Sequence, residues 1–83
     1  MYCVYAISSE MRPYIYLGLT DNIHRRLNEH NSGKNKTTKS YGPFKLIHTE
    51  SFKTRADARI REKELKSGFG KEFLKKIVAK EKI

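Results

Sequence analysis

Five side chains of types used in phosphate chemistry are spread along the chain: Tyr5, Tyr16, Arg26, His30 and Glu62. An arginine binds phosphate oxygens in a bidentate manner, and a histidine donates to a phosphate oxygen or acts as an acid or base. A carboxylate holds a metal ion that neutralises phosphate charge, and a tyrosine or a metal-bound water handles the attacking proton. Together these residue types favour phosphodiester cleavage.

Each of these residues also has an ordinary structural interpretation. Tyrosines in strands are usually core residues with hydroxyls at the rim, and Arg26 and His30 also suit a solvated helix face. Glu62 lies in the apolar stripe formed by Ala58, Leu65 and Phe69, where a carboxylate needs a partner. That partner is either a metal ion or a cation such as Arg26 in a salt bridge at the core rim.

The charge of the chain narrows its class of partner. The 83 residues carry a formal net charge of +9, and a field of this sign attracts nucleic acid phosphates or anionic membranes. The length predicts one domain over residues 1–83. A single cysteine allows no internal disulfide, and neither a membrane-spanning apolar run nor a signal-peptide pattern is present. We therefore expect a cytoplasmic protein that does not engage a membrane.

The first part of the chain reads as a hairpin followed by a helix. Residues 2–7 and 14–18 are rich in aromatic and β-branched residues, so they predict two antiparallel strands. Side chains alternate across a strand, so Tyr5 and Tyr16 can share one face of the sheet. Gly18 is expected to allow a tight turn into the helix.

That first helix is predicted over residues 20–33, with Thr20 or Asp21 as its cap. Ile23 and Leu27 form its apolar stripe, and Arg26 and His30, four apart, share the face beside that stripe.

The rest of the chain predicts a loop, a strand and two helices. Residues 34–43 are a basic, turn-rich loop, and 44–52 alternate as a third strand. Helices follow over 54–68, from a Thr54 cap to a Gly68 stop, and over 71–83. The order β-β-α-β-α-α indicates a small α/β (α+β) sandwich with helices packed on a short sheet. Phosphate contacts are expected from lysines in and after the loop, for which a solvated loop is the alternative: Lys34, Lys36, Lys39 and Lys45.

At these positions the chain resembles the GIY-YIG nuclease superfamily, as a small stand-alone member. The family's first motif matches "CVY", residues 3–5, and its second matches "YLG", residues 16–18. Arg26 stands ten residues after the second tyrosine, His30 four residues further on, and Glu62 lies in the helix after the third strand. The resemblance covers essentially the whole chain and extends to the N-terminal nuclease domain of the bacterial excision-repair incision subunit.

The resemblance implies a three-stranded antiparallel sheet flanked by helices and a divalent-metal-dependent endonuclease acting on DNA. Glu62 would hold one Mg²⁺ or Mn²⁺, and Tyr5 would act as general base, directly or through a metal-bound water. Tyr16 would orient that water or the phosphate, with exchange of the two tyrosine roles left open. Arg26 would bind the scissile phosphate, and His30 would assist it or position Tyr5.

The chain departs from the family pattern at two points. Cys3 and Val4 replace the glycine and isoleucine of the first motif, which is tolerable because Tyr5 is retained. No asparagine matches the one that larger members carry late in the domain, and this absence, with the minimal size, leaves open a nucleic-acid-binding module with little or no catalysis. The amphipathic third helix leaves open a protein-interaction module. For the nuclease, repair substrates and single-stranded or branched DNA are the expected targets, with little sequence preference.

Overall fold

The sheet is built around the N-terminal strand. The computed structural model describes residues 1–36 and 38–81, and its first strand, β1 (Tyr2–Ser9), lies in the middle of the sheet order β2-β1-β3. The neighbours β2 (Ile15–Thr20) and β3 (Phe44–Phe52) both pair with β1 in antiparallel orientation. This confirms the predicted three-stranded antiparallel sheet.

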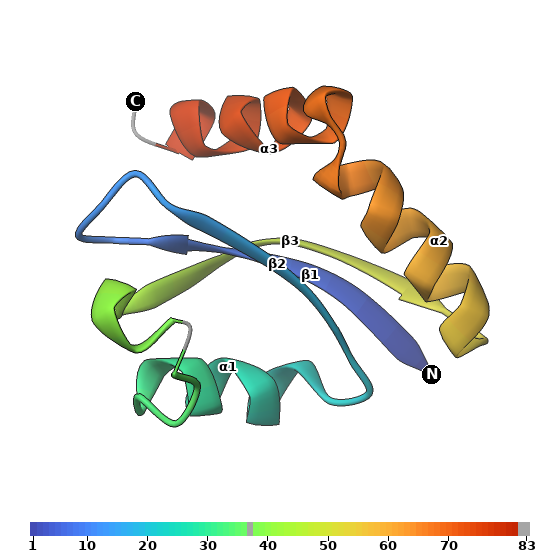
Figure 1. The fold of residues 1–83 in the computed structure, drawn as a ribbon, viewed down its shortest axis with the longest axis horizontal. Helices are drawn as coiled ribbons and strands as arrows, with labels where there is room; N and C mark the ends of the chain where they lie inside the picture. The colour runs from blue at the N-terminus through green and yellow to red at the C-terminus, as the bar shows by residue number, and fades with distance from the viewer. Residues whose placement is uncertain (37, 82–83) are drawn as a thin grey trace.

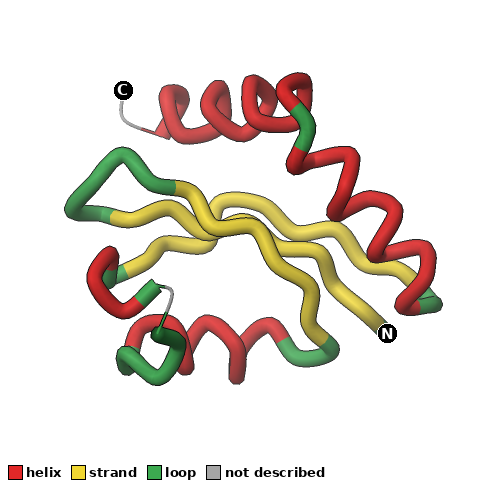
Figure 2. The backbone as a smooth tube through the Cα atoms, in the orientation of Figure 1, coloured by secondary structure: helices red, strands yellow, loops and turns green. Residues whose placement is uncertain are grey.

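Helices cover both faces of this sheet. Helix α1 (Ile23–Asn31) lies on one face, whereas α2 (Arg55–Lys66) and α3 (Gly68–Glu81) lie over the other (Figure 1). A short 3-10 helix, Lys39–Tyr41, leads into β3. Figure 2 shows the loop between β1 and β2 extending beneath α3. The predicted order β-β-α-β-α-α and the α+β class are therefore confirmed.

Alternation along β1 divides the interior into two apolar clusters. Val4 packs with Ala58 and Leu65 of α2, while Tyr5 and Ile7 pack on the other face towards α1. The odd residues of β1 thus face α1 and the even ones face α2, as the period of two in a strand requires. Because of this division, Tyr5 belongs to the layer between the sheet and α1.

The helix ends differ from the sequence prediction at several points. Asn22, not Thr20 or Asp21, caps α1, because its side chain accepts from the backbone N–H of Arg25 at 3.0 Å. Thr20 is still paired in β2. Thr54 caps α2, as predicted. However, α2 already ends before Ser67, and Gly68 is the first residue of α3 instead of the residue that ends α2.

The early start of α3 also changes the environment of Phe69. Its side chain is 88% exposed, so the prediction that it continues the buried face of α2 is wrong. The break at Ser67 separates the two helices, and the helical phase of α2 does not carry over. The last two residues of the predicted third helix, 82–83, and residue 37 of the predicted loop lie outside the described residues.

Within the described part of the chain, no helix has both the length and the apolar character needed to cross a membrane.

Candidate active site

Tyr5 lies at the centre of the α1 side of the sheet and is fully buried. It pairs with Gly18, and Ile7 pairs with Tyr16, so both tyrosines project from the same face. Their ring centroids are 6.2 Å apart. The predicted sharing of one sheet face by the two tyrosines is confirmed.

The absence of a side chain at Gly18 leaves room for the Tyr5 phenol to pack against β2. A Cβ at Gly18 would lie 2.6 Å from the Tyr5 hydroxyl oxygen and 2.7 Å from its Cζ, well inside contact distance. Gly18 lies within β2, which continues to Thr20, and of the described glycines only Gly33 has positive φ. The prediction that Gly18 provides a turn is therefore wrong: the missing side chain allows a close approach between strand and ring.

His30, at the end of α1, is hydrogen-bonded to the Tyr5 hydroxyl. Its side chain is 1% exposed, with Nε2 lying 2.9 Å from the Tyr5 hydroxyl and Nδ1 lying 2.8 Å from Thr38 Oγ1. Burial lowers the pKa of His30, and the positive charge of Arg26 lowers it further. The ring is thus held neutral between a strand and the loop after α1.

Arg26 lies one turn before His30 and completes this group. Burial alone would lower the pKa of its guanidinium, but interactions with the nearby Tyr5 hydroxyl, with Glu29 and with the Tyr16 hydroxyl outweigh burial and raise it. Nη1 donates to Glu29 Oε1 at 3.0 Å. Because 30% of the Arg26 side chain is exposed, its charge is still accessible to a ligand in solution.

These contacts assign the direction of each hydrogen bond at Tyr5. Burial raises the pKa of the Tyr5 phenol to about 12, despite an opposing interaction with Arg26, so the phenol is protonated at neutral pH. With the phenol protonated and His30 neutral, we assign the shared hydrogen to Tyr5, which donates it to His30 Nε2 while its oxygen faces the Arg26 guanidinium, a group that can only donate. Nδ1 then carries the hydrogen of the neutral ring and donates it to Thr38.

Glu62 comes from α2, on the other side of the sheet. It is 8% exposed, and its charge acts on Tyr5, whose pKa it raises. Its carboxylate pairs with Lys66 at 3.5 Å and Arg59 at 3.8 Å, both exposed residues of the same helix. Arg26 instead donates to Glu29. A salt bridge at the core rim is thus present, but with these two partners.

The oxygen donors fit a loosely held hard cation. Residues 1–36 and 38–81 contain no cluster of three His, Cys, Asp or Glu side chains arranged to hold a metal. Mg²⁺ is commonly bound through one or two carboxylates, with waters and substrate phosphates filling its other positions. The single, nearly buried carboxylate of Glu62 fits such an ion, which would be completed by substrate.

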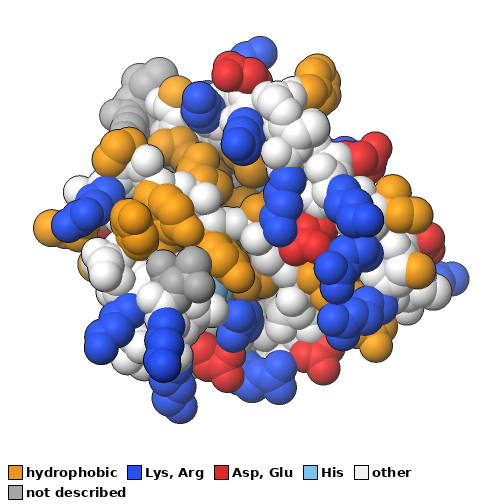
Figure 3. Space-filling view, viewed as in Figure 1, with side chains coloured by type: hydrophobic (Ala, Val, Ile, Leu, Met, Phe, Trp, Pro, Cys, Tyr) orange, Lys and Arg blue, Asp and Glu red, His pale blue; other side chains and the backbone are white. Residues whose placement is uncertain are grey.

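The predicted phosphate-binding lysines are exposed. Lys34, Lys36 and Lys39 follow α1 in the loop that also carries Thr38, whereas Lys45 lies on β3 opposite Ser8. Lys and Arg side chains also gather over α2 and α3 on the face shown in Figure 3. The basic surface is therefore wider than the loop that the sequence indicated.

Two residues of this region were missed from the sequence. Thr38 is fully buried and holds His30, and Lys66 pairs with Glu62. Nothing in the spacing of Thr38 distinguishes it from other polar residues of the loop. The spacing of Glu62 and Lys66, four residues apart on a helix, was a usable signal for an ion pair.

Known proteins with similar sequences belong to a family of nucleases. The model of the GIY-YIG catalytic domain matches residues 1–77, and GIY-YIG domains form a nuclease superfamily whose members bind nucleic acid and typically use a divalent metal. A UPF0213 protein of Haloquadratum walsbyi is 44% identical over 54 residues, covering 64% of this chain. That match spans only 61% of the Haloquadratum protein, less than two thirds of its length.

Two further relatives match over more of their length. A UPF0213 protein of Halobacterium salinarum is 40% identical over 67 residues, 80% of this chain and 86% of that protein. A solution NMR structure of a UPF0213 protein from Bacillus halodurans superposes with a TM-score of 0.54 at 34% identity, covering 93% of this chain and 85% of that one. By the match to residues 1–77 and by these relatives, the chain belongs to the GIY-YIG family.

Proposed function

We propose that the protein is a divalent-metal-dependent endonuclease that hydrolyses phosphodiester bonds in DNA. The observation that carries the proposal is the Tyr5 hydroxyl, buried between Arg26 and His30 and within the field of Glu62. A structural tyrosine needs one hydrogen-bond partner. A hydroxyl that faces an arginine and donates to a neutral histidine is arranged to pass a proton on.

In this proposal Arg26 binds the scissile phosphate. Its exposed part leaves room for two phosphate oxygens, and its charge opposes the negative charge that develops in the transition state. The Tyr16 hydroxyl, which interacts with Arg26, would keep the guanidinium oriented towards the substrate.

Tyr5 then serves as the proton acceptor, with His30 behind it. Because the phenol has a pKa of about 12, a free phenolate is scarce at neutral pH. Tyr5 is closed to solvent without substrate, so the proposal requires that substrate binding admits the attacking water to its hydroxyl. Tyr5 would then take a proton from that water only as it passes its own proton to His30 Nε2. His30 becomes an imidazolium whose Nδ1–H remains bonded to Thr38. The neutral state of His30 before reaction is what makes it able to accept.

Glu62 would hold one Mg²⁺ or Mn²⁺, whose chemistry is to neutralise phosphate charge and to acidify bound water. To bind the ion, the carboxylate exchanges its contacts with Arg59 and Lys66. The nitrogens of Arg59 and Lys66 lie 3.8 and 3.5 Å from the carboxylate, which is longer than a typical hydrogen bond. Breaking these two contacts therefore costs little free energy.

The test is cleavage of supercoiled plasmid, single-stranded circular DNA and a branched oligonucleotide with Mg²⁺, Mn²⁺ or chelator. Glu62→Gln should abolish cleavage, whereas Glu64→Gln, at an exposed carboxylate of the same helix, should leave it unchanged. Failure of the parent to cleave any of these substrates with either metal would refute the proposal. Equal loss in both variants would refute the role of Glu62.

A nucleic-acid-binding module without catalysis is the second candidate. It is favoured by the single carboxylate, since the described residues contain no three-ligand metal cluster. It predicts salt-sensitive DNA binding that forms no products and survives Glu62→Ala, because phosphate contacts release counterions.

A further inference from the structure

A groove of about 630 Å³ lies between the β1–β2 hairpin and the two helices α2 and α3. Its apolar lining comes from both sides: Ile15, Leu17, Leu65, Leu74 and Val78. In Figure 3 hydrophobic side chains gather in a hollow beneath α3 on this face, with Lys and Arg side chains along its rim. Its volume is that of a small-ligand site.

The polar lining of the groove has one sign of charge. Its cationic residues are Arg12, Lys66, Lys71 and Lys75, and no Asp or Glu is among its described lining residues. Lys75 lies 3.8 Å from Glu72, but both side chains are 69% exposed, so this ion pair is weak. A groove lined by one sign of charge concentrates ligands of the opposite sign.

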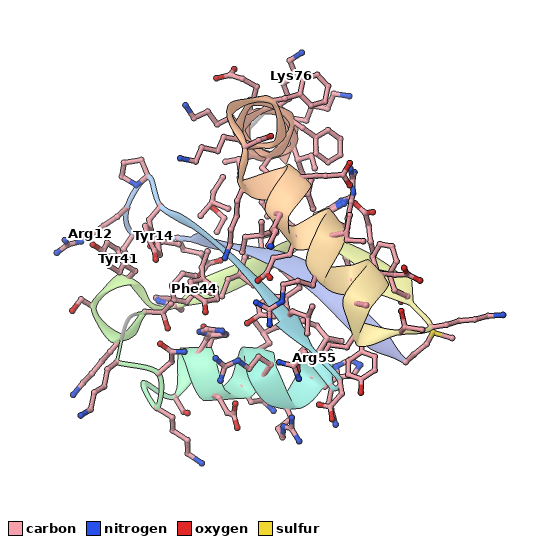
Figure 4. All side chains as sticks on the ribbon, turned by 45° about the vertical axis from the view of Figure 1, so that its right-hand side comes forward. Arg12, Tyr14, Tyr41, Phe44, Arg55 and Lys76 are labelled. Atoms are coloured by element: carbon pink, nitrogen blue, oxygen red, sulfur yellow. The ribbon has the colours of Figure 1, made fainter. Side chains whose placement is uncertain are left out.

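Two residues connect the groove with the candidate active site. Tyr16, whose hydroxyl interacts with Arg26, and Lys66, which pairs with Glu62, both line it. Arg12 and Tyr14 also line the groove. On the α1 side of the sheet, Tyr14 stacks on Tyr41 with ring centroids 4.1 Å apart, and the Arg12 guanidinium lies 5.6 Å from the centre of the Tyr41 ring. Figure 4 shows these three side chains together at the hairpin end of the sheet.

We propose that this groove binds a single strand of nucleic acid next to the scissile phosphate, a proposal that rests on the proposed function. Lys71 and Lys75 contact the phosphates, and unpaired bases lie on the apolar lining. Base pairing hides those surfaces, because a duplex presents phosphates, sugars and base edges but not base faces. The mixture of apolar lining and cationic rim thus selects an unpaired strand.

The charge of the chain argues against a second copy as the occupant. A protein with a net charge of +9 repels itself, and the rim of the groove is positive. An acidic peptide would satisfy the lysines but would leave most of the apolar lining uncovered.

The test is fluorescence anisotropy of labelled oligo(dT) and of a duplex of equal length, in chelator so that no cleavage occurs. Lys71→Gln/Lys75→Gln removes two groove cations. Lys76→Gln/Lys80→Gln removes two exposed cations from α3 that do not line the groove, and Lys76 points away from the body of the protein in Figure 4. The two variants therefore change the net charge equally.

Each single-strand phosphate contact contributes about 0.7 to the slope of log affinity against log salt, or roughly five-fold at 0.1 M salt. The groove variant should therefore bind oligo(dT) about 25-fold more weakly and lower the salt slope by about 1.4. The control should change binding by less than about three-fold.

Equal loss in both variants would overturn the proposal, since net charge alone would then explain binding. Duplex binding as tight as oligo(dT), with equal loss in the groove variant, would overturn the single-strand assignment. So would equal competition by polyglutamate, or a concentration-dependent dimer blocked by the groove substitutions. Because binding is read without metal, these outcomes are independent of whether the parent cleaves DNA.

Discussion

Replacing Gly18 by alanine tests the packing that places Tyr5. The new Cβ would lie 2.6 Å from the Tyr5 hydroxyl oxygen, 2.7 Å from its Cζ and 3.0 Å from Cε2 of Tyr16. The Tyr5 ring cannot move aside easily, because it is buried and its hydroxyl is hydrogen-bonded to His30. The backbone of Gly18 has no left-handed conformation, so alanine at this position meets no backbone strain.

The magnitude follows from two opposing terms. An alanine in a strand gains about 0.5–1 kcal/mol over glycine in backbone entropy, and overpacking a filled core costs about 1–3 kcal/mol. The central values of these ranges give a net loss of about 1.3 kcal/mol in the free energy of unfolding, or roughly 5–10 °C in melting temperature for a domain of this size. Displacement of the phenol should also lower the cleavage rate by about 100-fold.

The assay is urea unfolding followed by circular dichroism, with Gly68→Ala as the matched control. A Cβ at Gly68 meets no atom within 4 Å, so that variant should be as stable as the parent or slightly more so. In a double-mutant cycle, Tyr5→Phe should reduce the effect of Gly18→Ala by more than about 0.5 kcal/mol. A Gly18→Ala protein with parental stability and cleavage rate would refute the reasoning.

Three further predictions concern the surroundings of this phenol. Thr38→Val removes the acceptor of His30 Nδ1–H and should lower the free energy of unfolding in urea by about 1–3 kcal/mol. Thr49→Val, at an exposed position, should lower it by less than about 0.5 kcal/mol, and equal effects would contradict the assigned bond. Because the pKa of His30 is lowered in the folded protein, the unfolded state binds more protons below about pH 6.5. The free energy of unfolding should therefore decrease as the pH is lowered from about 6.5, until the pH has dropped below the folded pKa. His30→Gln should flatten that slope below about pH 6.5, and an unchanged slope would disprove the assignment. Chelator should stop cleavage without shifting the melting temperature, because no three-ligand metal cluster exists among the described residues; a shift of several degrees would indicate a structural ion.

The strands of the sheet followed from local patterns. The alternation in residues 44–52 predicted β3 with its observed bounds, and the hairpin allowed Tyr5 and Tyr16 to share one face. The alternation within each strand is fixed by the backbone, whereas the pairing of Ile7 with Tyr16, which decides that the two tyrosines share a face, is a property of the hairpin register.

The helix cap and the role of Gly18 depended on longer-range structure. Thr20, Asp21 and Asn22 are all suitable cap residues, and the extension of β2 to Thr20 decides between them. Gly18 permits a turn or a close approach equally well, and only the ring that packs on it distinguishes the two.

The contacts that define the site lay beyond local reasoning. Thr38 meets His30 through the fold of a loop, and Glu62 acts on Tyr5 from a helix on the opposite face of the sheet. Such contacts arise from how α1 and α2 pack on the sheet, which residue spacing along either helix does not specify.

The most direct test of the account is the single-turnover cleavage rate of Tyr5→Phe beside Tyr2→Phe, both checked for folding by circular dichroism. Tyr2 lies on the opposite face of β1 and packs against the α2 cluster. The account predicts that Tyr5→Phe lowers the rate by at least about 100-fold, whereas Tyr2→Phe changes it by less than about two-fold. A folded Tyr5→Phe protein that cleaves DNA at the parental rate would contradict the proposed role of this phenol.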